Sequence, residues 1–144
     1  MRKMAKWEEF YIIQKDSGQT LFHKSFSKKN YDADLFAGLF TAILQFAKAY
    51  SKSSIGDFEM KKKVILIGQS DQYPLIFVYI VDKSQIKKKK KVKKMIKIII
   101  KDFESEYDIN SIRKWNGNIN MFKPFGQKVD EVLHPWKTFE SLGF

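Results

Sequence analysis

The segment Leu75–Val81, with the sequence LIFVYIV, is apolar at every position. Successive side chains of a strand point to opposite sides of a sheet, so a strand formed by this segment is apolar on both faces. Such a strand is covered on both sides and lies in the interior of its sheet. Seven residues are also far too few to cross a bilayer. The segment therefore predicts a sheet with a layer of structure on each side.

The N-terminal part of the chain predicts a β-hairpin. Glu9–Lys15 (EFYIIQK) is apolar on both faces and indicates a second interior strand. Asp16–Gln19 supplies turn residues, and Gly18 can adopt a positive φ there. Thr20–Ser27 continues as a strand of mixed polarity, which is typical of a sheet edge.

A helix is expected next, with Asn30 or Asp32 as its N-cap. Its main apolar stripe is Leu35, Leu39, Ile43, Phe46 and Tyr50. The stripe is widened by a second set: Phe36, Phe40, Leu44 and Ala47. Either neighbouring elements cover this extra width, or Phe40 and Leu44 face a partner chain. A strip of small residues beside the stripe would let another backbone approach closely: Gly38, Ala42 and Ala49.

Three further strands and three helices are predicted after this helix. The half-polar segment Ile55–Met60 indicates another edge, whereas Val64–Ile67 and Leu75–Val81 form a second hairpin. Strands one, four and five are thus expected in the interior, and strands two and three at the edges. A long amphipathic helix fits residues 84–107, and two short helices fit residues 108–114 and the region of Phe125, Val129, Val132 and Leu133. The apolar stripe of the long helix is Val92, Met95, Ile96, Ile99, Ile100, Phe103 and Tyr107. Its opposite, outward side is expected to carry Lys90, Lys93, Lys94, Lys97 and Lys101.

Much of the formal net charge of +11 comes from one lysine cluster at the start of the long helix. The segment from residue 87 to residue 97 contains no acidic residue. Its lysines are Lys87, Lys88, Lys89, Lys90, Lys91, Lys93, Lys94 and Lys97. Lysines at a helix start oppose the helix dipole, so helix stability does not account for them. Three interpretations remain open: a solvated face, an anionic membrane surface, or nucleic acid. Base recognition is disfavoured because aromatic side chains do not alternate with the lysines.

No catalytic constellation is recognisable in the sequence. His23 and His134 have no partner at a useful spacing, and the chain has no cysteine and no glycine-rich phosphate loop. The acids, including Glu8 and Glu9, are expected on solvated faces. We therefore predict no enzymatic activity and no cofactor. The lack of cysteine and of an apolar leader is typical of a cytoplasmic protein, and the membrane interpretation of the lysine cluster implies a location peripheral to a membrane.

The predicted order β-β-α-β-β-β-α-α resembles the longin fold of the roadblock/longin superfamily. The stretch YIIQKDSGQTLF from Tyr11, followed by Ser25-Phe-Ser, is similar to the opening hairpin of longin-like proteins. Asp34-Leu-Phe-Ala-Gly-Leu-Phe-Thr-Ala-Ile is similar to their first helix, and Leu75–Val81 with its following Lys-rich helix also matches. The resemblance, strongest to longin-like proteins of Asgard archaea, extends over residues 8–107 and more loosely over 115–133.

This resemblance implies a single α+β domain (an α/β sandwich) over residues 1–144, with its core in 8–107 and C-terminal helices and a tail in 108–144. The implied sheet has five strands, antiparallel or mixed, in the order 2-1-5-4-3, with helices on both faces. The family carries no catalytic signature and serves as adaptors and as platforms for small GTPases in membrane trafficking.

We therefore expect a protein-protein interaction module that binds a small GTPase or another longin or roadblock subunit, as a homodimer or heterodimer. Its candidate partner interface comprises Phe40, Leu44, Phe58 and Met60. The alternative is a peripheral binder of anionic membrane or nucleic acid that acts through the cluster from Lys87 to Lys97.

Overall fold

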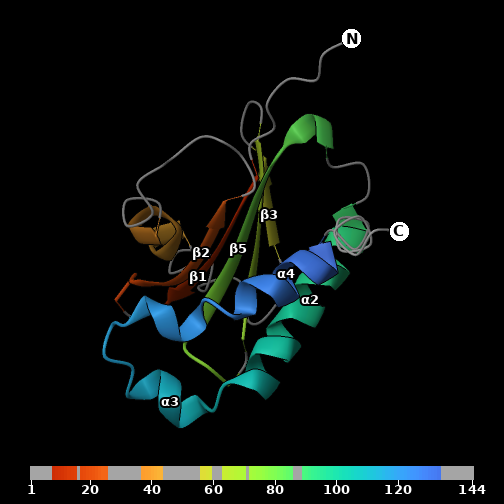
Figure 1. Ribbon diagram of the computed structural model, residues 1–144. Coiled ribbons are helices and arrows are strands. Elements are labelled where there is room, and N and C mark those ends of the chain that lie inside the picture. Colours follow the sequence, from red (N-terminus) through yellow and green to blue (C-terminus); the bar gives the residue numbers. More distant parts are fainter. Residues whose placement is uncertain are drawn as a thin grey trace.

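The computed structural model describes residues 8–15, 17–25, 37–43, 56–59, 63–70, 72–85 and 89–133 (Figure 1). The strands are β1 (Glu8–Gln14), β2 (Thr20–Ser25), β3 (Gly56–Glu59), β4 (Lys63–Gln69) and β5 (Leu75–Asp82). A helical segment covers residues 37–43. The later helices are η1 (Lys83–Gln85), α2 (Lys89–Glu106), α3 (Ile109–Arg113), η2 (Ile119–Phe122) and α4 (Phe125–Leu133). The predicted α+β class is confirmed.

The five strands form one sheet in the order β2-β1-β5-β4-β3, which confirms the predicted order. Every pairing between neighbours is antiparallel, so the sheet is not mixed. β1 pairs with β5 along its whole length, from Glu8 opposite Val81 to Gln14 opposite Leu75. β1, β4 and β5 lie in the interior because their side chains are apolar on both faces, and the more polar β2 and β3 lie at the edges.

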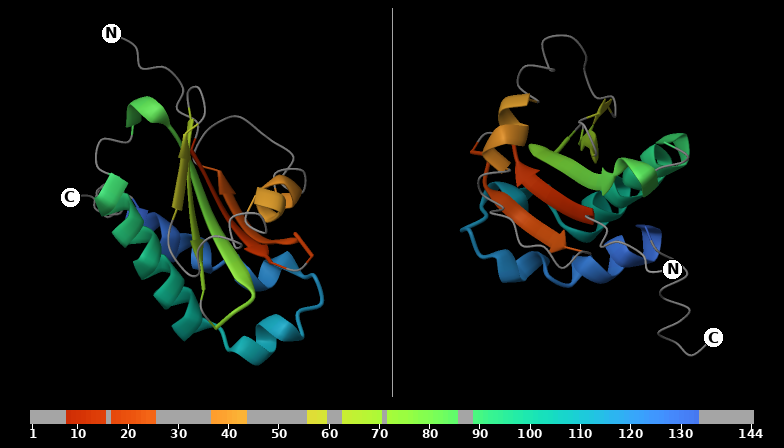
Figure 2. Two further views of the ribbon diagram at one scale, coloured as in Figure 1. Left: turned by 180° about the vertical axis from the view of Figure 1, so that it is seen from behind. Right: turned by 90° about the horizontal axis from the view of Figure 1, so that it is seen from above.

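Two hydrophobic cores lie on opposite faces of this sheet (Figure 2). Alternate residues of β5 contribute to each: Phe77 and Tyr79 to the larger core, Ile76 and Val78 to the smaller. The larger core is covered by α2, α3, η2 and α4, and the smaller one by the helical segment 37–43. The prediction of helices on both faces is therefore confirmed.

Within the described segment the predicted main stripe of the first helix is wrong at Leu39, whereas burial of Phe40 agrees with the alternative that neighbouring elements cover the extra width. Phe40 is completely buried, with its ring centroid 6.1 Å from that of Tyr11, whereas Leu39 is 49% exposed. Ala37 and Thr41, which were in neither predicted set, are buried beside Phe40, and Ile43 of the predicted main stripe is partly buried against the same core. Two neighbouring apolar stripes have the same periodicity, and only packing against the sheet selects between them.

Gly18 explains how closely the β1–β2 turn approaches this helical segment. Its φ of +75° belongs to the left-handed region that favours glycine. A Cβ atom at this position would lie 3.3 Å from the Thr41 Oγ1 atom and 3.9 Å from the Gly38 Cα atom. A side chain at position 18 would therefore adopt a strained backbone conformation and push against Thr41.

The large core is joined to α2 by aromatic and apolar side chains. Ile96, Ile99, Ile100 and Phe103 are buried on the sheet side of α2, as the predicted stripe requires. The Phe103 ring lies 5.2 Å from that of Phe125 in α4, centroid to centroid. α2 begins at Lys89 in the described chain, later than predicted, and η2 was not predicted.

The β4–β5 loop is attached to the end of α2. The Tyr73 hydroxyl lies within hydrogen-bonding distance of two backbone oxygens, 3.0 Å from that of Glu104 and 2.8 Å from that of Tyr107. Ser70 also donates a hydrogen bond to the Glu104 carboxylate. These contacts fix the far end of α2 relative to the sheet.

Candidate functional site

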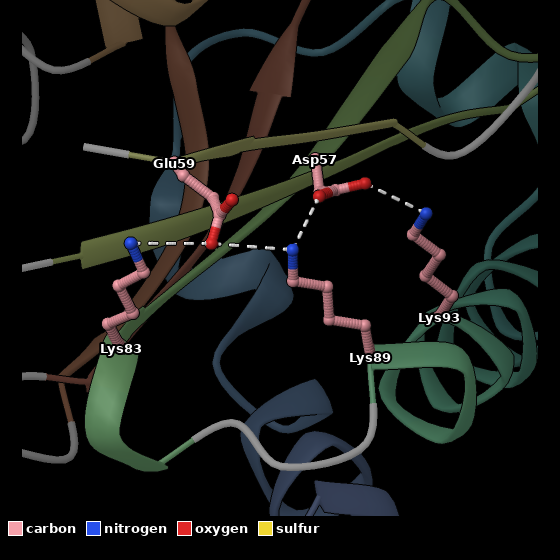
Figure 3. A network of polar contacts seen from close by, with 5 residues as sticks. All are labelled: Asp57, Glu59, Lys83, Lys89 and Lys93. Atoms are coloured by element: carbon pink, nitrogen blue, oxygen red, sulfur yellow. Dashed lines mark hydrogen bonds and ion pairs between the residues drawn. The ribbon is translucent and has the colours of Figure 1, made fainter.

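The lysines around the start of α2 fall into two sets that face different surroundings. Three of them, Lys83, Lys89 and Lys93, form ion pairs with the acids of β3 (Figure 3). We call these three the pairing lysines. The other lysines described on α2 point away from the sheet. Sequence reasoning treated the whole cluster as one surface.

Asp57 and Glu59 of β3 are the centre of this ion-pair network. The Lys93 Nζ atom lies 2.9 Å from Asp57 Oδ1, and the Lys89 Nζ atom lies 3.2 Å from Asp57 Oδ2. Lys89 is also 3.5 Å from Glu59 Oε1, which Lys83 approaches to 3.6 Å. Both acids lie on the α2 side of β3, since Asp57 is opposite Leu66, a residue of the larger core.

The network changes the electrostatics of both partners. Hydrogen bonding from Lys93, followed by that from Lys89, holds the pKa of Asp57 below its ordinary value despite partial desolvation. Hydrogen bonding to Asp57 raises the pKa of Lys89. The first turn of α2 contains no acid and its last turn no base. The negative charge that a helix start favours is therefore supplied from the neighbouring strand.

The remaining lysines form an exposed strip on the outer side of α2. We call it the outer lysine face; it consists of Lys90, Lys91, Lys94, Lys97 and Lys101. Within the described part of the chain, no ion pair involves any of these five side chains. The predicted outward orientation is confirmed for Lys90, Lys94, Lys97 and Lys101, whereas Lys93 is half-buried and bonded to β3. Lys87 and Lys88 lie outside the described residues.

One apolar side chain adjoins the outer lysine face. Ile98 is 50% exposed, although α2 has a continuous apolar stripe on its other side. At 100° per residue, Ile98 lies between Lys91 and Lys94 around the helix axis, with Lys101 one turn further along. Ile98 therefore lies at one margin of the lysine strip, with Asp102 one turn along on its other side, and adds an accessible apolar side chain to the positive surface.

Of the four side chains of the predicted partner interface, the structure describes only that of Phe40. Phe40 is a core residue and not an exposed contact, because the sheet covers its ring. Phe58 pairs with Ile65 through its strand, which confirms its place on the β3 edge. The Phe58 side chain, Leu44 and Met60 lie outside the described residues. What the helical segment does expose is Gly38, Leu39 and Ala42.

A buried carboxylate on β1 was also missed. Glu9 was expected to be solvated and His23 to lack a partner, but Glu9 is fully buried and lies 2.7 Å from the His23 Nε2 atom. Ser25 donates a 2.5 Å hydrogen bond to the other Glu9 oxygen. The His23 ring stacks on Tyr11 at a centroid distance of 4.5 Å. The sequence feature that could have indicated this burial is the position of Glu9, which lies on the same face of an interior strand as Tyr11 and Ile13.

This polar cluster is not arranged as a nucleophile and base. A serine nucleophile needs a hydrogen bond to the imidazole that takes its proton. Here Ser25 and His23 both bond to Glu9, so the carboxylate separates them. Their arrangement satisfies a buried charge, as buried carboxylates require.

Two further properties of the described residues concern metals and membranes. They contain no group of three or more His, Asp or Glu side chains that could hold a metal ion. None of their helices combines the length and apolarity that crossing a bilayer requires. Comparison of the sequence with protein-family models and with curated proteins found no match.

Proposed function

We propose that this protein is a longin-like, non-enzymatic interaction module that binds a protein partner, either a small GTPase or another longin or roadblock subunit. The observation that carries the proposal is the strand order β2-β1-β5-β4-β3 with helices on both faces. The sequence resemblance to longin-like proteins implies this same arrangement.

The exposed side of segment 37–43 is the surface that best suits a protein partner. Leu39 is 49% exposed, and the neighbouring Gly38 and Ala42 are exposed and small. No atom lies within 4 Å of a Cβ built on Gly38, so the space above it is open. A partner element can therefore approach this backbone closely, with Leu39 as its apolar contact.

Two substitutions test this surface without removing core packing. Leu39→Asp places a charge in the contact, and Gly38→Gln blocks close approach. Gly38→Gln also replaces glycine in a helix, so it should keep or slightly raise stability. We expect each to weaken partner binding at least tenfold while the thermal melting temperature stays unchanged or rises.

The binding measurement uses small GTPases from the same genome, loaded with GDP or a non-hydrolysable GTP analogue, in biolayer interferometry. Light scattering on the protein alone reports homodimerisation. Met121→Asp is the matched control, because Met121 is 38% exposed on η2, on the opposite side of the sheet. No binding in either nucleotide state, together with a monomer at high concentration, would contradict the proposal.

A further inference from the structure

We propose that the outer lysine face of α2, together with the exposed Ile98 at its margin, is a docking surface for an anionic lipid membrane. The ion pairs with β3 involve none of the lysines of this face. Asp57 and Glu59 pair with Lys83, Lys89 and Lys93, while Lys90, Lys91, Lys94, Lys97 and Lys101 remain exposed. The described chain thus neutralises one set of lysines and presents the other to an external anion.

The acids of β3 also fix the direction in which the outer lysine face points. Lys89 and Lys93 tie the first turns of α2 to the edge strand, and Ile96 and Ile99 bury its middle against the sheet. Tyr73 fixes the other end. The helix is therefore held at three levels along its length, so the lysines form a strip of constant orientation. α2 lies at the outer margin of the molecule in both views of Figure 2, where an extended surface can reach it.

Ile98 distinguishes between the anions that could meet this face. A lipid surface can accept an apolar side chain below the level of the headgroups while lysines contact the phosphates. A nucleic-acid backbone offers phosphates but no apolar phase, and the described face carries no aromatic ring for base stacking. A 50% exposed Ile98 next to Lys91, Lys94 and Lys101 therefore fits a membrane surface better.

This surface is separate from the one proposed for the protein partner. The outer lysine face belongs to the layer over the larger core, and the helical segment 37–43 covers the smaller core on the other side of the sheet. One molecule can therefore contact a membrane and a protein partner at the same time. Loss of either interaction leaves the other measurable.

The experiment is co-sedimentation of the full chain with phosphatidylcholine vesicles that contain or lack phosphatidylserine, at low and high salt. We expect binding to the anionic vesicles alone, with strong weakening at high salt. The triple reversal Lys90→Glu, Lys94→Glu and Lys97→Glu should reduce binding by at least roughly a hundredfold, since each lysine near such a surface contributes about fivefold and each glutamate adds repulsion. Ile98→Asn should reduce it by about tenfold, because an apolar contact is lost.

The matched control reverses Arg113, Lys114 and Lys123, which are exposed beyond α2 and give the same net charge. It should bind as the unaltered protein does. If the control loses as much binding as the α2 variant, net charge alone is responsible and the proposal is wrong. Circular dichroism checks the fold, and Lys→Gln substitutions at the same three positions replace the reversals if those unfold.

Two other results would overturn the proposal. One is the absence of vesicle binding by the unaltered protein at low salt. The other is tight binding to duplex DNA that the α2 reversals abolish and Ile98→Asn leaves unchanged, which would assign the face to nucleic acid.

Discussion

At the scale of single residues, Asp57 and Glu59 determine which lysines of α2 remain accessible. They lie on a four-residue edge strand and face the start of the helix. Because they bond to Lys89 and Lys93, the charges of those two lysines are neutralised within the fold. The lysine cluster of the sequence is thus divided by two acids that lie more than 25 residues upstream of the helix.

The contribution of Asp57 to stability can be measured through its pH dependence. Its pKa is lowered from the ordinary 3.8, so the ionised form is favoured by folding. Asp57→Asn should therefore lower the free energy of unfolding at pH 7 by at most about 1 kcal/mol, since the ion pairs are solvent-exposed. This difference from the unaltered protein should shrink as the pH falls below about 4, where the unfolded chain begins to bind the proton.

Urea unfolding at pH 7, 5 and 3 would measure this effect. Glu131→Gln is the control, because Glu131 is exposed on α4 and has no ion pair within the described residues. A difference between Asp57→Asn and the unaltered protein that stays constant down to pH 3 would show that the carboxylate does not act through its charge.

At the scale of secondary-structure elements, the helical segment 37–43 shows where periodicity is insufficient. Phe40 was assigned to the outer width of the apolar stripe and Leu39 to its centre, whereas the structure buries Phe40 and exposes Leu39. A pattern that is apolar over half a helix does not identify the buried line within it. The small residues Ala37 and Thr41 beside Phe40, and the turn at Gly18, determine it through packing.

This orientation predicts unequal effects from two neighbouring substitutions. Phe40→Ala should lower the free energy of unfolding by about 3–5 kcal/mol, because it leaves a cavity against Tyr11. Leu39→Ala should change it by no more than about 0.5 kcal/mol, as expected for an exposed position. Chemical denaturation of both variants would test the assignment. A larger loss for Leu39→Ala would restore the orientation that the sequence suggested.

The sheet, by contrast, could be predicted well from the sequence. β1 and β5 are apolar on both faces, which is sufficient to place them in the interior, and the polar His23 and Lys24 mark β2 as an edge. The order β2-β1-β5-β4-β3 followed from the family resemblance together with these polarities. The Glu9–His23 pair and the Asp57–Lys93 pair could not be predicted, because each requires the register or packing of separate elements.

At the scale of the whole molecule, the sheet couples the two hydrophobic cores. Neighbouring residues of β5 enter different cores, so neither core can lose its packing without disturbing the shared strand. We expect one cooperative unfolding transition, as is usual for a domain of this size. Ile80→Ala in the smaller core and Ile99→Ala in the larger should each lower the stability of that one transition by about 2–5 kcal/mol.

Two spectroscopic probes would test this coupling. Trp115 packs against the larger core, and its fluorescence can be isolated by replacing Trp7 and Trp136 with Phe. Far-UV circular dichroism reports on the whole sheet. The two curves should coincide for both alanine variants, and an early dichroism change without a fluorescence change in Ile80→Ala would indicate that the cores unfold separately.

The position of β5 at the centre of the sheet also has a consequence for protein synthesis. β1 leaves the ribosome first and can pair with β2 at once, but its other edge has no partner until Leu75–Asp82 has been made. An emerging chain therefore exposes one edge of an apolar strand for the time needed to add about sixty residues. β5 itself is an apolar, β-branched segment of the kind that associates with copies of itself. The lysines that follow it directly place repulsive charge beside that segment, and such flanking charges oppose self-association while the sheet is still incomplete.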